Sequence, residues 1–188
     1  MAHLFKNLFT SDQIEVFYDE VREKDLPFFE VNTTYISNGL GRLSDDYQTL
    51  DFFRLKIEQK LREVYNFNFK YSHSFSSIYR NRSVLNLHVD RLSLDITASL
   101  CAIKGTKTPF PLFVSTKLLE EDPVLLLRDN PNYFYDNTSY FKQDYQSFEL
   151  LNGDVAVCLG TKEPHWREML VCDEKEYNFY VFFHWTRV

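Results

Sequence analysis

The spacing of apolar residues divides the chain into a helical first third and an alternating remainder. Residues 12–25 and 47–67 repeat apolar side chains every three or four positions, which predicts two amphipathic helices. Ser11 precedes the first helix and is a suitable N-cap. The apolar faces consist of Ile14, Phe17, Tyr18 and Val21 in the first helix, and of Leu50, Phe53, Ile57, Leu61 and Val64 in the second. Each helix should therefore bury one side against another element.

From about Phe67 onward, apolar and polar positions alternate, and β-branched and aromatic residues become frequent. Short strands separated by turns are typical of a β-sandwich or a jelly roll. We therefore expect an α+β fold that is mainly β, with two supporting helices in front. The pattern predicts strands at residues 69–79, 84–90, 94–103, 110–115, 154–160, 165–171 and 177–185.

Residues 116–145 break this alternation, because Pro and Asn interrupt them and Tyr is abundant. Such a segment has the character of an insertion or lid, where substrate-binding residues often lie. Its Tyr-rich part, residues 130–141, either forms an aromatic wall against the substrate or covers the barrel as an ordered insertion. Residues 1–188 are expected to be one domain, with a helical support region at 1–66 and a β core at 67–188.

Composition and charge narrow the classes of partner and compartment. The 188-residue chain has a formal net charge of −6 and no long cluster of Lys and Arg, so we expect no nucleic-acid partner. Its three cysteines form neither a zinc motif nor a disulfide framework, which favours a reducing compartment. The first residues lack the apolar run of a signal peptide, and no stretch reaches membrane-spanning length. We therefore expect a cytoplasmic protein with no membrane partner.

The segment LNLHVD places His88 and Asp90 two positions apart in a predicted strand, so both side chains lie on one face. The pair is either a hydrogen-bonded couple or two thirds of a metal site. His165 is the best third ligand, because a jelly roll brings such a late strand beside an early one. Two histidines and one carboxylate that leave coordination positions open are typical of non-haem Fe(II) oxygenases.

A longer pattern surrounds these residues. The segment YRNRSVLNLHVD resembles the Tyr-x8-His-x-Asp core of the Fe(II)/2-oxoglutarate-dependent dioxygenases, in their prolyl 4-hydroxylase-like branch. The segments LLNGDVAVCLGTKEPHWREML and YNFYVFFHW are similar to the C-terminal pattern of some small members of this superfamily. The resemblance extends from about Tyr79 to Trp185, with the middle insertion unmatched. It implies a double-stranded β-helix, which is a jelly roll, with the N-terminal helices packed outside one sheet.

The same resemblance assigns a set of site residues. It implies that His88, Asp90 and His165 are the catalytic centre and ligate Fe(II), and that Tyr79, nine residues before His88, helps to hold the co-substrate 2-oxoglutarate. The other two histidines in the β region, at positions 73 and 184, are interpreted as structural, with a possible supporting contact to the site. Trp166 alternates away from His165 and is expected in the core.

The far carboxylate of 2-oxoglutarate needs a cation of fixed geometry, and two residues are candidates. Arg167 lies two positions after His165, so on a strand it faces the same side as that ligand. Lys175 lies ten positions after His165, the spacing of the lysine with this function in prolyl hydroxylases, but its charged neighbours are typical of a solvated turn. We favour Arg167, with Lys175 as the alternative.

The implied reaction consumes 2-oxoglutarate and O2, releases succinate and CO2, and hydroxylates a C–H bond of a peptide, an amino acid or another small molecule. Related halogenases lack the carboxylate ligand, so Asp90 favours hydroxylation. The alternative is a cupin-like metal-binding or ligand-binding module without turnover. A metal-dependent isomerase or hydrolase is less favoured, because no general base stands out beside the ligands. A cation near the metal separates these classes, since only the oxygenase needs one for its dicarboxylate.

Overall fold

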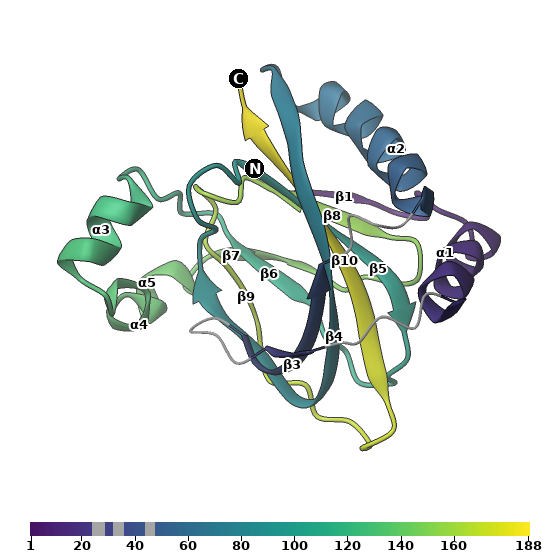
Figure 1. Ribbon diagram of the computed structural model, residues 1–188. Coiled ribbons are helices and arrows are strands. Elements are labelled where there is room, and N and C mark those ends of the chain that lie inside the picture. Colours follow the sequence, from purple (N-terminus) through teal and green to yellow (C-terminus); the bar gives the residue numbers. More distant parts are fainter. Residues whose placement is uncertain (24–28, 32–35, 44–47) are drawn as a thin grey trace.

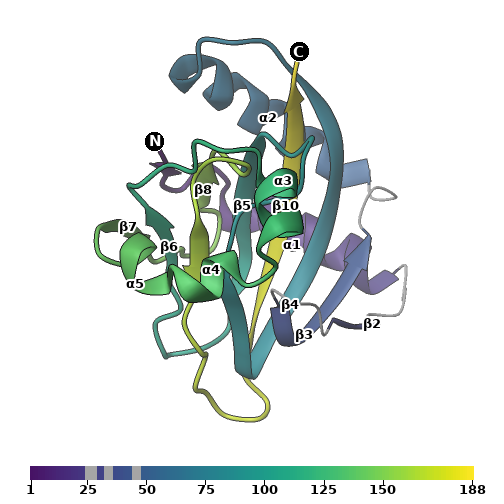
Figure 2. The ribbon, with the colours of Figure 1, turned by 90° about the vertical axis from the view of Figure 1, so that its left-hand side faces the viewer.

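The computed structural model describes residues 1–23, 29–31, 36–43 and 48–188 of the protein. Its strands form an antiparallel sheet in the order β1-β8-β5-β10-β4-β9-β6-β7, and β3 joins β2 to β4 (Figure 1). Seen from the side, the sheet closes over itself as a jelly roll, which confirms the expected double-stranded β-helix (Figure 2). The strands are β1 (His3–Phe5), β2 (Phe29–Val31), β3 (Ile36–Leu43), β4 (Phe69–His88), β5 (Ile96–Lys104), β6 (Leu112–Ser115), β7 (Tyr145–Phe148), β8 (Val155–Cys158), β9 (His165–Arg167) and β10 (Tyr177–Arg187).

Strand β4 is long enough to pair with strands in both layers of the barrel. Its first part pairs with β10, where Tyr79 lies opposite Asn178, and its second part pairs with β9, where His88 lies opposite His165. The sequence predicted two strands separated at residues 80–83. The structure joins them into one strand, because β3 pairs with residues on both sides of this stretch, and Arg82 within it has a positive φ of 67° and donates its N–H to the carbonyl of Leu170. One strand therefore serves both layers of the barrel.

Helices α1 (Ser11–Glu23) and α2 (Gln48–Val64) pack together against the outer face of β5 and β10, as predicted (Figure 1). Phe17 of α1 stacks on Phe179 of β10, with ring centroids 6.0 Å apart. Thr10, rather than the predicted Ser11, caps α1: the Gln13 N–H donates to its hydroxyl, and its own N–H donates to the Gln13 side chain. This reciprocal pair is a capping box. Predicted helix residues 24, 25 and 47 lie outside the described residues.

The insertion at 116–145 is ordered and helical. It contains α3 (Pro123–Asp129), α4 (Tyr133–Asp136) and α5 (Thr138–Phe141), which lie beside β6 and β9 at one edge of the barrel (Figures 1 and 2). Phe134 and Phe141 are buried in a cluster with Trp166 and Leu87, on the outer face of β9 and β4. Tyr135 and Tyr140 are exposed. These helices therefore pack against the outer face of β4 and β9.

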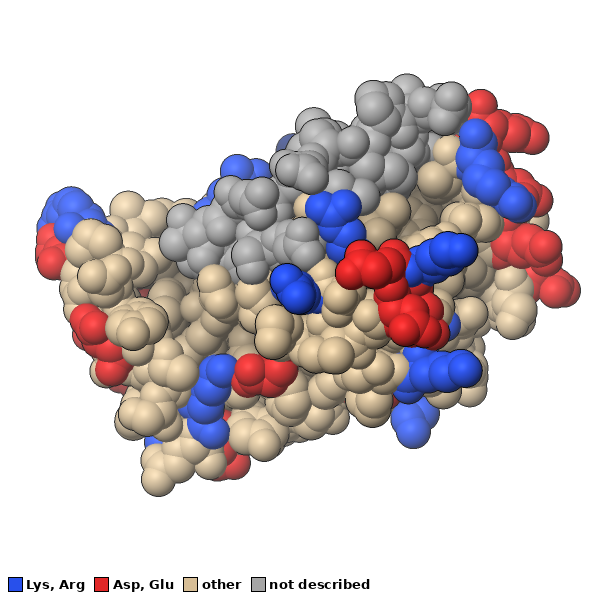
Figure 3. Space-filling model, turned by 90° about the horizontal axis from the view of Figure 1, so that it is seen from below, with Lys and Arg blue, Asp and Glu red and all other residues tan. Residues whose placement is uncertain are grey.

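Several strands lie outside the predicted set: β1, β2, β3 and β7. β3 reads ISNGLGRL, and its two glycines and asparagine are residues that strands usually avoid, so the pattern did not reveal it. Among the described helices, none is long and apolar enough to cross a membrane. On the face shown in Figure 3, the described Lys and Arg side chains are interspersed with Asp and Glu side chains.

Candidate metal centre

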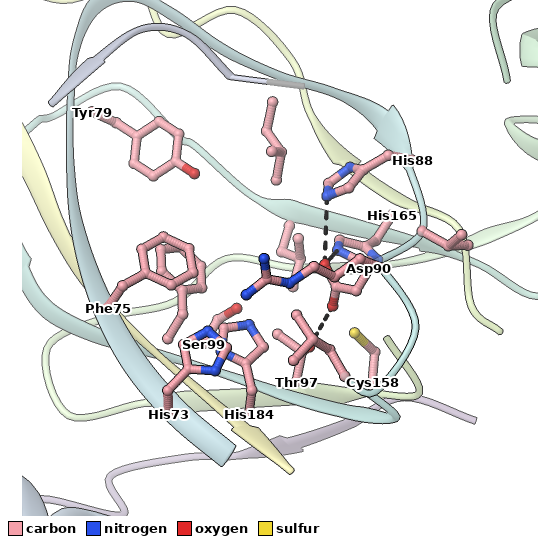
Figure 4. Close-up of a pocket in the computed structure, with 16 residues that line it drawn as sticks. His73, Phe75, Tyr79, His88, Asp90, Thr97, Ser99, Cys158, His165 and His184 are labelled. Atoms are coloured by element: carbon pink, nitrogen blue, oxygen red, sulfur yellow. Dashed lines mark hydrogen bonds and ion pairs between the residues drawn. The ribbon is translucent and has the colours of Figure 1, made fainter. Parts of the chain in front are cut away.

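The predicted triad comes together where β4 ends and β9 begins. His88 and His165 are paired across the two strands, and Asp90 follows in the loop after β4. The Oδ1 atom of Asp90 lies 3.8 Å from Nε2 of each histidine, and the three ligand atoms are all within 4.8 Å of one another (Figure 4). All three side chains are shielded from solvent, with the two histidines buried and Asp90 partly so. These distances leave room for one ion between the three donors.

The backbone holds both imidazoles in the orientation that metal binding requires. Nδ1 of His88 lies 2.8 Å from the carbonyl oxygen of Asn86, and Nδ1 of His165 lies 2.9 Å from that of Glu163. A carbonyl only accepts hydrogen bonds, so each Nδ1 carries the proton and donates it. Each Nε2 therefore presents its lone pair towards the common point. A ring N–H donated to a carbonyl is the usual support of a histidine that ligates a metal.

The charges of the ligands also suit a divalent cation. Burial and, to a lesser degree, the proximity of His165 lower the pKa of His88 to about 4. The His88 ring is therefore neutral at pH 7. Burial alone would raise the pKa of Asp90, but the neighbouring histidines and the Thr97 hydroxyl keep it below its usual value. The donor set contains an ionised carboxylate and a neutral imidazole that loses no proton when a metal binds.

Two residues that the sequence analysis did not identify fix the position of Asp90. The Thr97 hydroxyl of β5 donates to Oδ2 of Asp90 (Figure 4). Gly160 accepts a 2.8 Å hydrogen bond from the Asp90 backbone N–H. A Cβ atom at Gly160 would collide with the Asp90 carboxylate and the Leu94 carbonyl. The glycine in the segment CLGTKEP was the available signal, but a glycine needed for close approach cannot be distinguished by sequence from one in a turn.

The triad opens into a cavity of about 380 Å³ inside the barrel. This volume is in the range of small-molecule sites. In Figure 4, Tyr79 and Phe75 lie across the cavity from the triad, and His73 and His184 lie at its lower edge. The described residues of the insertion do not contribute to its lining. The cavity is lined by His73, Phe75, Tyr79, Leu85, His88, Val89, Asp90, Arg91, Leu94, Thr97, Ser99, Leu112, Cys158, His165, Phe182 and His184.

Arg167 lies in the barrel interior as predicted, behind Tyr79 rather than in the cavity lining itself. Its side chain has no exposed surface, and its guanidinium carbon is 4.3 Å from the Tyr180 ring centroid and 5.9 Å from that of Tyr79. One nitrogen donates to the Phe110 carbonyl at 2.6 Å. Nε and the second terminal nitrogen have no hydrogen-bond partner among the described residues. Buried donors without partners are rare in proteins, and these two atoms can each donate to one further acceptor.

The hydroxyl of Tyr79 is also buried and lacks a partner in the described part of the chain. Burial raises the pKa of Tyr79 to about 12, and the positive charge of Arg167 partly opposes this rise. The hydroxyl is therefore protonated and free to donate. Tyr79 lines the cavity and contacts the region of Arg167, so it connects the open space with the guanidinium.

Lys175 lies elsewhere. It is exposed in the turn before β10 and does not line the cavity. At the start of β10, the buried side chain is Asn178, whose oxygen accepts a hydrogen bond from Thr106. Trp166 is buried on the opposite face of β9 and stacks on Phe113, as expected. His184, interpreted as structural, is buried but also lines the cavity.

Comparisons with known proteins address the fold. No protein-family model matches the sequence. No curated protein matches it either. Solved structures do match: a Pseudomonas putida prolyl-4-hydroxylase has a TM-score of 0.63 at 16% identity, over 100% of this chain and 92% of that one. HygX from Streptomyces hygroscopicus, crystallised with nickel, 2-oxoglutarate and hygromycin B, has a TM-score of 0.65 at 13% identity, over 97% and 82%.

A third match is SnoN, a non-haem α-ketoglutarate-dependent epimerase from nogalamycin biosynthesis. Its TM-score is 0.72 at 10% identity, over 97% of this chain and 78% of that one. The chain therefore has the fold that 2-oxoglutarate-Fe(II) oxygenases use, including prolyl hydroxylases. At these identities the likeness concerns the fold, so the chemistry must be argued from the side chains.

Proposed function

We propose that the protein is a non-haem Fe(II)- and 2-oxoglutarate-dependent oxygenase, most simply a hydroxylase. One observation supports this above all others: a His-Asp-His centre and a buried, incompletely paired arginine lie in the same barrel. A passive metal site has no use for the arginine. A dicarboxylate co-substrate requires a fixed cation at the end remote from the metal.

His88, Asp90 and His165 would hold the iron, and three ligands leave its remaining positions open. When bound, the iron would supply the chemistry by which O2 converts 2-oxoglutarate to succinate and CO2 and places its other oxygen atom in the substrate C–H bond. The protein contributes position and environment. Arg167 and Tyr79 bind the far carboxylate through their unpartnered donors, Thr97 keeps Asp90 in place, and the apolar walls exclude water.

The proposed substrate is a peptide, an amino acid or another small molecule with a C–H bond that reaches the cavity. The cavity volume of about 380 Å³ supports this range, because it admits small groups only. Among the structural neighbours, HygX was crystallised with hygromycin B, which is a small molecule. The three cysteines are free thiols, which supports the proposed cytoplasmic location.

Anaerobic spectroscopy tests the proposal directly. Fe(II) is added to the purified protein, then 2-oxoglutarate, and the weak visible charge-transfer band of the chelated complex is recorded. We expect the band in the wild-type protein and its loss in His165→Ala, because that change removes one iron ligand. Iron binding without the band would support the metal-binding module instead. No iron binding at all would return His88 and Asp90 to an ordinary couple.

A further inference from the structure

One basic side chain faces the metal cavity from the side of the triad. Arg91 directly follows Asp90, is solvent exposed, and is the single Lys or Arg among the described residues that line the cavity. Among the described residues, no side chain forms an ion pair or hydrogen bond with its guanidinium. Its position differs from that of Arg167, which lies behind Tyr79. Arg91 is therefore the arginine at the exposed side of the cavity, and Arg167 is the buried arginine next to Tyr79.

A second polar group at the same cavity lacks a partner. His184 is 2% exposed and stacks between His73 and Phe75, with centroids 4.8 and 5.5 Å away. Its Nδ1 atom has no hydrogen-bond partner in the part of the chain that the structure describes. With the ring proton on Nε2, Nδ1 is an acceptor whose lone pair is unpaired.

The charge state of this ring supports the assignment. Burial lowers the pKa of His184 to about 4, so the ring is neutral at pH 7. A neutral Nδ1 lone pair accepts a hydrogen bond from an N–H or O–H group and does not itself attract an anion. An unpaired buried acceptor is costly, so the site is complete only when a ligand provides the donor.

The rest of the wall near these two residues is apolar. Phe75 stacks on Phe182, with ring centroids 4.9 Å apart, and Val89, Leu94 and Leu112 also line the cavity. Within about 380 Å³, the cavity must accept both 2-oxoglutarate and the reacting part of the substrate. These walls suit a small, apolar group.

We propose that the substrate is a small organic acid that carries an N–H or O–H group beside its carboxylate. The carboxylate pairs with Arg91, the adjacent group donates to Nδ1 of His184, and an apolar body lies against Phe75 and Phe182. An amino acid or a hydroxy acid has this chemistry, and so does the C-terminal residue of a peptide. The proposal rests on the oxygenase function and names its substrate class.

The test is a protein-detected NMR titration with leucine as the probe, first on metal-free protein and then on protein loaded with Zn(II) and 2-oxoglutarate. Matched probes remove one feature each: leucinamide lacks the carboxylate, and 4-methylpentanoate lacks the amine. A dipeptide that ends in leucine tests the peptide source. Arg91→Gln removes the cation, and His184→Phe keeps the ring stacking but removes the acceptor. Arg128→Gln, an exposed arginine on α3 that pairs with Asp129, is the matched control.

Leucine or the dipeptide should bind at least about tenfold more tightly than its matched probes, because each probe loses one hydrogen bond to a charged or buried group. Arg91→Gln and His184→Phe should each weaken this binding about tenfold or more, while Arg128→Gln leaves it unchanged. Binding of the dipeptide alone would identify a peptide as the source of the acid.

Equal binding of leucine and leucinamide, or full affinity in Arg91→Gln, would overturn the proposal. So would a loss of 2-oxoglutarate affinity in Arg91→Gln with leucine affinity intact, because Arg91 would then serve the co-substrate. The titration of the metal-free protein measures leucine binding at Arg91 and His184 in the absence of iron. A missing Fe(II)–2-oxoglutarate band would therefore count against the oxygenase function and not against this site.

Discussion

Replacing Arg167 by methionine separates a binding function of this residue from a structural one. Methionine has a similar reach and fills the aromatic surroundings of Tyr79, Phe110 and Tyr180, but it carries no charge and no donors. If Arg167 binds the far carboxylate, the change removes a charged hydrogen-bond donor that is worth about 1.5–3 kcal/mol. The dissociation constant of 2-oxoglutarate should therefore rise by about 10- to 150-fold.

The effect of Arg167→Met on stability should be small. The change leaves the Phe110 carbonyl without its 2.6 Å partner, at a cost of about 1–3 kcal/mol. It also removes a fully buried charge whose Nε and second terminal nitrogen have no partner among the described residues. Removing a buried charge that lacks an ion-pair partner also removes its desolvation cost, which favours the folded variant. The two terms have opposite signs, so the free energy of unfolding should stay close to that of the wild type.

The assay is an anaerobic titration of the Fe(II)-loaded protein with 2-oxoglutarate, followed by the charge-transfer band, with urea unfolding of each variant. Lys175→Met is the comparison, because Lys175 is exposed in the turn before β10. A twofold change or less in the Arg167→Met dissociation constant, with a large loss of stability, would refute a binding function. A loss of affinity in Lys175→Met would transfer that function to the lysine.

Further predictions concern the surroundings of the triad. Thr97→Val removes the hydroxyl that donates to Asp90, so the affinity for Co(II) or Fe(II) should fall about 10- to 100-fold. Thr97→Ser keeps a hydroxyl and should retain the metal affinity of the wild type. Equal metal affinities in the two variants would contradict the positioning of Asp90 by Thr97. Gly160→Ala places a Cβ atom against the Asp90 carboxylate, so metal affinity should fall at least about tenfold. The circular dichroism spectrum should stay that of the wild type. Unchanged metal affinity would mean that the loop moves to accommodate the added methyl group. The folded-state pKa values of His88 and His184, about 4, lie below the ordinary value of 6.5, so the unfolded chain binds more protons between these pH values. The free energy of unfolding of the metal-free protein should therefore decrease as pH falls from about 6.5 to 4, by up to about 1.4 kcal/mol per pH unit for each histidine. In urea unfolding at several pH values, His184→Phe should reduce this pH dependence of the free energy of unfolding. An unchanged pH dependence would show that His184 does not contribute to it.

The metal ligands could be predicted from the sequence, because few residue types bind a metal ion and the chain has few histidines. His88, Asp90 and His165 were predicted as ligands because the His-x-Asp spacing and the late position of His165 fit a jelly roll, and the structure brings their ligand atoms within 4.8 Å. Arg167 could be favoured over Lys175 from alternation alone, since alternate residues of a strand share a face. The structure places Arg167 inside and Lys175 outside.

Features that depend on three-dimensional approach were not visible in the sequence. Thr97 meets Asp90 only because β5 passes the loop after β4, and a threonine on a strand is too common to indicate this. β4 continues through Arg82, whose positive φ is unusual for that residue type, and β3 pairs with both of its parts. His184 was interpreted as structural because its neighbours are aromatic, although alternation along β10 placed it on the same face as the interior Tyr180 and Phe182.

The position of β10 has a consequence for how the protein folds. β10 is the last described strand in chain order, yet it lies between β5 and β4 in the sheet. β9, which carries His165, comes directly before β10 in the chain. During synthesis, the edges of β4 and β5 that pair with β10 therefore stay unpaired until residues 105–176 have been made. Non-local pairing of this kind slows folding and exposes strand edges to other chains. His88 of β4 and the following Asp90 are therefore made early, and the strand edge beside them is covered by β10 only after His165 has also been made.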